Sequence, residues 1–100
     1  MGSVGNEILS LLSKRCVWQI INELRETRCG ILNITALVNR LNANYEYVVN
    51  CVKLLERYGI VESVKVGRLR LVKLNTNNET CRLMIAVMDA ISSSRRIATT

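Results

Sequence analysis

The stretch from Asn33 to Lys73 constrains the fold of this chain more than any other part of the sequence. Its middle section, Asn44 to Tyr58, places apolar residues at positions 48, 52 and 55. That i, i+4, i+7 spacing turns one stripe of an α-helix toward a hydrophobic core. On the opposite side, four residues spaced by 4, 3 and 4 share one exposed face: Glu46, Asn50, Lys53 and Arg57.

A second helix and a short turn precede this segment. Asn33 is a good N-cap for a helix over 34–41. A turn follows at 42–44, and Asn44 can cap the next helix. A turn this short is what a helix-turn-helix unit requires. The residues of the first helix that we expect to point inward are Ile34, Leu37, Val38 and Leu41.

Two short strands of alternating character follow the second helix. Gly59 ends the helix, and Gly67 separates two runs in which apolar and basic residues alternate. This pattern predicts a β-hairpin with one apolar face and one cationic face. A change of phase at Leu71 and Val72 predicts a bulge or the end of the strand. Four cations, with no acid among them, lie in this hairpin: Lys65, Arg68, Arg70 and Lys73.

The helices expected near the two ends of the chain are unusually apolar. The first should begin at Asn6, and the last should run from Glu79, capped by Asn78, to about Ser92. Their apolar surface exceeds what one small core can cover, so we expect it to meet a second copy of the chain. The predicted dimer interface consists of Ile8, Leu9, Leu12, Leu83, Met84, Val87, Met88 and Ile91.

The length and charge of the chain limit its organisation and its partners. With 100 residues there is room for one domain, which we place at 6–92, with a last helix at 78–92. Residues 1–5 should be disordered or tag-like, and 93–100 a flexible tail. The net charge of +6 favours a polyanionic partner, either nucleic acid or an anionic membrane surface. Short apolar runs and no secretion signal lead us to expect a cytoplasmic protein with no membrane span.

Four cysteines and no histidine limit the chemistry available to the chain. Cys16, Cys29, Cys51 and Cys81 are too widely spaced for the paired ligands typical of zinc sites. They are either small buried residues or, in a hyperthermophile, disulfide partners. Cys29 is the one we expect to be exposed, and a redox role for Cys29 or Cys51 stays open. We expect no metal site, no cofactor and no enzyme activity.

The order of these elements resembles the winged helix-turn-helix domains of bacterial and archaeal transcription regulators. The resemblance covers about Ser13 to Leu74, and its central run is Leu55-Glu56-Arg57-Tyr58-Gly59-Ile60-Val61. With the flanking helices it is most similar to the arsenic-repressor (ArsR) type, whose first and last helices form the dimer. The chain lacks the cysteine and histidine clusters of that family's metal sites, so no metal sensing is expected. The implied fold is mainly α with a small β-hairpin wing, an α+β winged helix-turn-helix.

This resemblance implies a homodimeric transcription regulator that binds specific double-stranded DNA. The helix over 45–58 would enter the major groove, where Asn50 pairs with adenine, Glu46 accepts from cytosine, and Lys53 meets guanine or phosphate. The wing would contact phosphate or the minor groove. The predicted DNA-binding residues are Tyr45, Glu46, Tyr47, Val49, Asn50, Lys53, Arg57, Lys65, Arg68 and Arg70.

Two alternatives remain open at the level of sequence. The two tyrosines can stack on sugars or touch thymine methyl groups, or they can pack on the neighbouring helix. The whole domain can also be a protein-interaction module of a larger assembly, in which the apolar end helices dock a different protein.

Overall fold

The computed structural model describes residues 2–99, with side chains described for residues 6–93. The elements follow the order expected for a winged helix. They are α1 (Gly2–Leu12), α2 (Arg15–Glu26), β1 (Ile31–Asn33), α3 (Ile34–Leu41), α4 (Tyr45–Arg57), β2 (Val61–Val66), β3 (Leu69–Leu74) and α5 (Glu79–Thr99). The expected fold class, mainly α with a β-hairpin wing, is confirmed.

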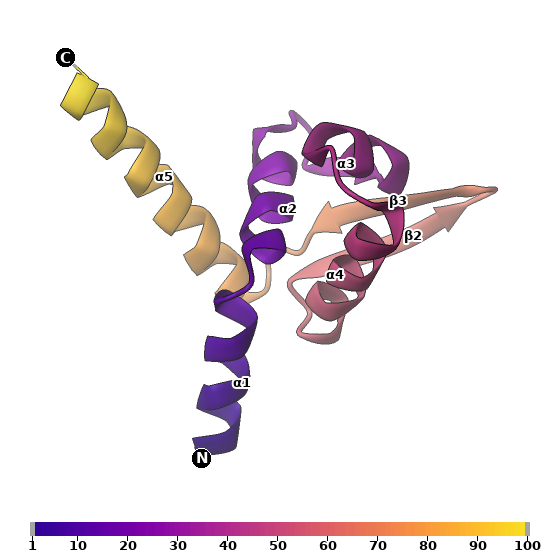
Figure 1. The fold of residues 1–100 in the computed structure, drawn as a ribbon, viewed down its shortest axis with the longest axis horizontal. Helices are drawn as coiled ribbons and strands as arrows, with labels where there is room; N and C mark the ends of the chain where they lie inside the picture. The colour runs from indigo at the N-terminus through magenta and orange to yellow at the C-terminus, as the bar shows by residue number, and fades with distance from the viewer. Residues whose placement is uncertain (1, 100) are drawn as a thin grey trace.

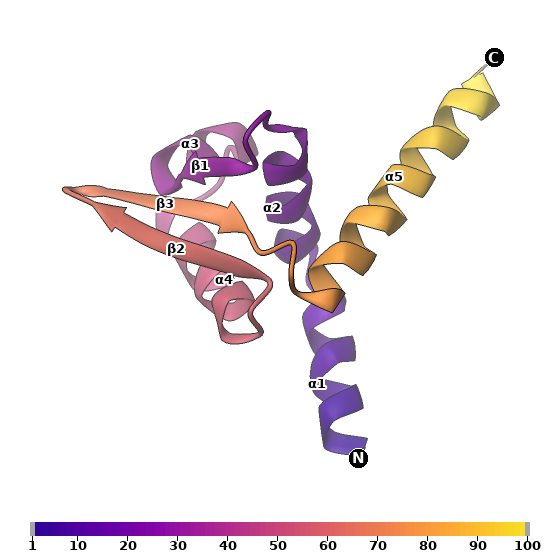
Figure 2. The same ribbon diagram turned by 180° about the vertical axis from the view of Figure 1, so that it is seen from behind.

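The molecule has a packed body with projections on two sides (Figure 1). Helices α2, α3 and α4 form the body together with the base of the sheet, and the β2–β3 hairpin extends away from it. On the other side, α1 and α5 project from the body in different directions (Figure 2). The two end helices therefore leave much of their surface outside the body of this single chain.

The core lies where α2, α3, α4 and the base of the sheet meet. Helix α2 buries Val17, Ile20, Ile21 and Leu24, whose i, i+3, i+4, i+7 spacing is that of one helical stripe. Burying each such aliphatic side chain contributes roughly 1.5–3 kcal/mol to folding. Helix α4 buries its predicted stripe as well, and adds one more residue: Val48, Cys51, Val52 and Leu55.

Asparagine side chains cap three of the helices. Asn33 accepts a hydrogen bond from the Ala36 amide (2.7 Å), and Asn44 accepts one from the Glu46 amide (2.8 Å). Asn78 accepts from the Cys81 amide at the start of α5 (2.9 Å). All three caps were predicted, and each satisfies a backbone donor that has no partner within its own helix.

The sheet is antiparallel, with the strand order β1-β3-β2. Gly67, with φ of +62°, begins a two-residue turn between Val66 and Leu69, as tight hairpins favour. The predicted bulge or strand end at Leu71 and Val72 is wrong, because the ladder continues unbroken to Leu74. The change of phase has another cause: β1 pairs with the base of β3, and the inner face there, with Val72, packs into the core.

The end helices are longer than their predicted bounds. Helix α1 begins at Gly2, before Asn6, and α5 continues past Ser92 to Thr99. Glycine disfavours a helix by only about 1 kcal/mol, and the sequence after Ser92 has neither glycine nor proline to end one.

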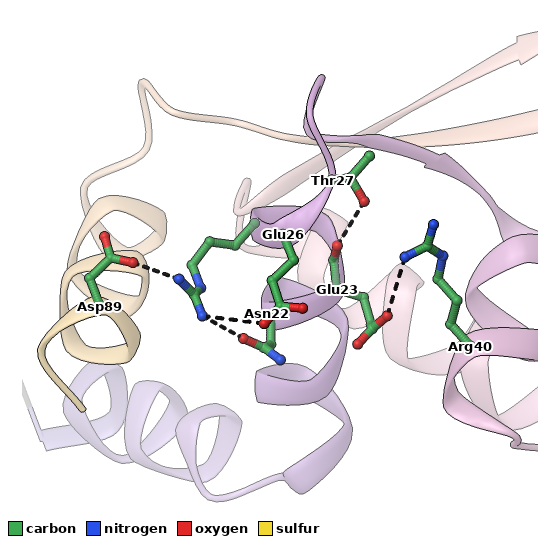
Figure 3. Close-up of polar contacts among 7 residues, drawn as sticks. Asn22, Glu23, Glu26, Thr27, Arg40 and Asp89 are labelled. Atoms are coloured by element: carbon green, nitrogen blue, oxygen red, sulfur yellow. Dashed lines mark hydrogen bonds and ion pairs between the residues drawn. The ribbon is translucent and has the colours of Figure 1, made fainter. Parts of the chain in front are cut away.

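Polar contacts hold α2 against α5 and α3 (Figure 3). Arg25 donates to Asp89 of α5 at 2.6 Å and to Asn22 at 2.9 Å. On the other side of α2, Glu23 forms an ion pair with Arg40 of α3 at 3.7 Å. Both pairs are partly exposed, so each contributes at most about 1 kcal/mol and mainly sets orientation.

The cysteines have three different environments. Cys16 at the start of α2 and Cys51 in α4 form a disulfide, with Cα atoms 6.4 Å apart. Cys81 is a buried free thiol, and Cys29 is an exposed one, as the sequence predicts. Burial raises the pKa of the Cys81 thiol above its usual value, which keeps that side chain neutral.

Candidate nucleic-acid interface

The outer face of α4 is an exposed polar surface on a rigid element beside the wing. Helix α4 is fixed by its buried stripe and by the Asn44 cap at its N-terminus. Because the opposite side is in the core, the predicted reading face points outward. Its exposed members are Tyr45, Glu46, Tyr47, Asn50, Lys53 and Arg57.

The two tyrosines at the start of α4 are available to a partner. Their exposed fractions are 59% for Tyr45 and 49% for Tyr47. About half of each side chain is therefore free to meet a ligand, and Tyr47 also borders α2 across a hollow whose lining includes Lys14 and Cys16. Val49 differs from them, because it is half-buried and packs against the core. It can therefore offer only part of its side chain to a ligand.

One cation beside the reading face was not indicated by the sequence, and it lines a shallow hollow there. The hollow has a volume of about 180 Å³, and its lining includes Lys14, Tyr47 and Asn50. Lys14 is the N-cap residue of α2, far from α4 in sequence. No local pattern relates these positions, so only the packing of α2 on α4 could reveal that Lys14 belongs to this surface.

Of the four wing cations, one is already paired within the described side chains. Lys65 and Arg68 are exposed, Arg68 in the turn itself. Arg70 is half-buried, and its Nη2 donates to Glu56 Oε1 of α4 at 2.9 Å. Ser63 donates to the same oxygen at 2.6 Å. The Glu56–Arg70–Ser63 cluster therefore ties the β2–β3 hairpin to the last turn of α4, and Arg70 is held away from a free phosphate-binding position.

The strand register places the three wing cations of β2 and β3 on two different faces, while Arg68 lies in the turn. Residues directly opposite each other share a face, so Lys65 lies with Arg70 on the inner face, toward α4. Lys73 lies opposite Glu62 on the outer face. That outer face is also the apolar one, and it is exposed at Val64, Val66 and Leu69 to between 52 and 55%. The sequence predicts one cationic face for the hairpin, but the structure has cations on both of its faces.

The predicted dimer residues lie on the outer surfaces of α1 and α5, with one exception, and two of them, Met88 and Ile91, border a second hollow between α5 and α2. A hollow of about 150 Å³ between the two helices includes Ile8, Leu12, Leu83 and Val87 in its lining. Met84 is only 2% exposed and belongs to the core of this chain, so it supports the surface from beneath. We call the rest the α1–α5 apolar surface: Ile8, Leu9, Leu12, Leu83, Val87, Met88 and Ile91.

Within residues 2–99, no cluster of three or more possible metal-binding side chains is found. None of the described helices is both long enough and apolar enough to cross a membrane.

The fold is similar to that of solved transcription regulators, although the sequences are distant. The chain matches no protein-family model and no curated protein. Reduced HlyU from Vibrio cholerae superposes with a TM-score of 0.72 at 18% identity, covering 90% of each chain. AntR, an antimony-specific transcriptional repressor, gives 0.72 at 17% identity, covering 95% of this chain and 82% of that one.

A third similar structure carries a description of its assembly. It is the homodimeric winged helix-turn-helix DNA-binding domain of Mb0332 from Mycobacterium bovis, a possible ArsR-family regulator. It superposes with a TM-score of 0.68 at 14% identity, covering 92% of this chain and 83% of that one. Likeness at these identities establishes the winged helix-turn-helix fold, and with it the resemblance to ArsR-type structures that the sequence suggested.

Proposed function

We propose that this protein is a homodimeric transcription regulator of the ArsR type that binds specific sites in double-stranded DNA. The observation that carries the proposal is the exposed polar face of α4, held rigid from behind and flanked by Lys14 and the wing. A helix presented in this way fits the major groove, and Lys65 and Arg68 are then placed to contact phosphates.

Each residue on the α4 face has a chemical role in this proposal. Asn50 forms a bidentate pair with adenine, Glu46 accepts from the cytosine amino group, and Lys53 contacts guanine or phosphate. Tyr45 and Tyr47 pack on sugars or thymine methyl groups. Because Glu46 offsets one cation on this face, the wing and Lys14 supply much of the attraction to the phosphate backbone.

The homodimer is supported by the α1–α5 apolar surface. Leu9, Leu83 and Ile91 are each more than half exposed in the single chain, which is costly for aliphatic side chains in water. Pairing this surface with its copy would place two α4 helices on one side of a duplex. The binding site would then contain two half-sites about one helical turn, roughly 34 Å, apart.

Selection of bound fragments from a random duplex library tests the proposal, because it measures binding and reads the site together. We expect enrichment of an inverted repeat. Lys65→Ala should weaken binding to the selected duplex, while Lys73→Ala, the same change on the outer face of the hairpin, should have a smaller effect. No enriched sequence, or equal losses in the two variants, would contradict the proposed orientation of the wing.

A winged-helix protein-interaction module is the second candidate, and the exposed apolar face of the wing favours it. Val64, Val66 and Leu69 form that face, and apolar patches on wings can bind another protein. Light scattering discriminates the two candidates. A dimer of the isolated chain supports the DNA-binding regulator, whereas a monomer that shows no DNA binding supports the interaction module.

A further inference from the structure

The Cys16–Cys51 disulfide lies directly behind the residues proposed to read DNA. It joins the first turn of α2 to the second turn of α4, and Asn50 is the immediate neighbour of Cys51. Both cysteines, together with Tyr47 and Asn50, contribute to the hollow of about 180 Å³ beside the reading face. We propose that this disulfide is a redox site that sets the affinity of α4 for DNA and is reduced by low-molecular-weight dithiols. The inference rests on the proposed function.

The hollow gives a small reductant a path to the bond. Cys16 and Cys51 are 7% and 4% exposed, and both line the hollow, which opens on the surface. Lys14 lies in the same lining, and its charge attracts an approaching thiolate. A dithiol is the fitting reagent because its second thiol completes the reaction without a second molecule entering.

The reaction is an ordinary thiol–disulfide exchange. The reductant's thiolate attacks one cysteine sulfur, the protein S–S bond breaks, and a mixed disulfide forms. The reductant's second thiolate then attacks the mixed disulfide and leaves as a cyclic disulfide. Two electrons pass to the protein, one S–S bond is lost and one is made, and the two cysteine thiolates take up the two protons that the dithiol releases. Reoxidation by a small-molecule disulfide reverses each step.

Reduction of the Cys16–Cys51 disulfide changes the packing between α2 and α4, behind the reading face. Two thiols need more room than a bonded pair of sulfur atoms, because non-bonded atoms cannot approach to bonding distance. The neighbouring core is tightly packed, and Val17, Val48 and Val52 are all fully buried. The extra room therefore comes from a shift of α4, or from rotation of a cysteine side chain into the hollow beside Tyr47 and Asn50. The disulfide form keeps α4 preorganised, so it should bind DNA more tightly.

DNA binding must in turn protect the bond. A duplex that contacts Tyr47 and Asn50 covers the mouth of the hollow. Thermodynamic linkage also requires that if the disulfide raises DNA affinity by some factor, DNA shifts the dithiol–disulfide equilibrium toward the disulfide by the same factor. A disulfide that served stability alone would leave the DNA affinity of the folded protein unchanged and would show no equilibrium shift.

The test compares the oxidised protein with protein reduced anaerobically by dithiothreitol, using a selected duplex. We expect the oxidised form to bind at least about fivefold more tightly, in the usual range of coupling between sites. In dithiothreitol redox buffers, the duplex should shift the equilibrium of the Cys16–Cys51 pair by that same factor, measured by alkylation and mass spectrometry. Cys29→Ser should retain the response, because that thiol is exposed and far from α4 in sequence.

The outcomes separate this inference from the proposed function. The double variant Cys16→Ala, Cys51→Ala should lose all response to dithiothreitol; if it does not fold, the wild-type comparison, with circular dichroism to confirm folding after reduction, decides alone. Equal, salt-sensitive DNA binding in both redox states would overturn the coupling and leave the proposed function standing. Absence of DNA binding in both states would overturn the proposed function and the coupling with it.

Discussion

Replacing Glu56 with alanine has two physical effects that change the DNA affinity in opposite directions. Oε1 of Glu56 accepts hydrogen bonds from Ser63 at 2.6 Å and from Arg70 at 2.9 Å, and so joins the wing to α4. Glu56→Ala removes a negative charge near the proposed DNA surface, which favours binding. It also releases the hairpin from α4, because Ser63 and Arg70 lose their shared acceptor, and this disfavours binding. The magnitudes decide which effect dominates.

The electrostatic gain is the smaller of the two. A unit charge about 10 Å from a phosphate interacts by roughly 0.4 kcal/mol in water, and by about 0.1 kcal/mol after screening at physiological salt. Hydrogen bonds to a charged group contribute about 1.5–3 kcal/mol when well shielded. The side chains of Glu56 and Arg70 are 31% and 29% exposed, so we discount the pair to about 1–2 kcal/mol.

We therefore expect Glu56→Ala to weaken DNA binding by about fourfold to twentyfold, since 1.4 kcal/mol corresponds to a factor of ten. Fluorescence anisotropy with a selected duplex would measure the change, at a temperature where circular dichroism shows the variant folded. Arg70→Ala should give a loss of similar origin, and the double variant should lose less than the sum.

Glu62→Ala is the matched control. Glu62 is an exposed acid on the outer face of the same hairpin, and it forms no ion pair within the described side chains, residues 6–93. Glu62→Ala changes the net charge by the same amount as Glu56→Ala, but it leaves the Glu56–Arg70–Ser63 cluster intact. If Glu56→Ala and Glu62→Ala both bind DNA as tightly as the wild type, or more tightly, the positioning role of Glu56 is refuted.

Four further results are expected. Asn50→Ala should relax preference at one base pair by about 1–3 kcal/mol, whereas Arg68→Ala should weaken binding to all sequences alike; a selection on each variant checks this. Asn44→Ala should lower the free energy of unfolding by about 1 kcal/mol through loss of its cap, as measured by urea denaturation. Iodoacetamide at mildly alkaline pH should label Cys29 before Cys81, because burial raises the pKa of the Cys81 thiol and thiolate is the reactive form. The stability contributed by the neutral Cys81 thiol should be complete below the unfolded-state pKa and be lost as pH rises through the raised folded-state pKa.

The sequence was most informative where structure is decided by near neighbours. The caps at Asn33, Asn44 and Asn78 were predictable because an N-cap acts on amides two or three residues away. The buried stripes of α2 and α4 were predictable from helical spacing alone. The turn at Gly67 follows from a local backbone preference in the same way.

Contacts between distant segments were beyond reach of these patterns. Cys16 and Cys51 are 35 positions apart, and their pairing depends on how α2 crosses α4. The contact of Arg70 with Glu56 depends on the angle at which the wing leaves the body, so alternation alone counted Arg70 among the free cations. Met84 was expected at the dimer surface because α5 is apolar all round, and only packing showed which side faces the core.

The dependence of DNA affinity on salt tests the central claim most directly. Five exposed cations per chain lie on the proposed surface, so a dimer presents twice that number: Lys14, Lys53, Arg57, Lys65 and Arg68. If all of them neutralise phosphates, log K should fall linearly against log salt with a slope of about −9, or roughly 10⁵ in affinity between 50 and 200 mM. The account predicts a slope approaching that value for the selected duplex. Affinity that is absent, or that barely changes with salt, would contradict it.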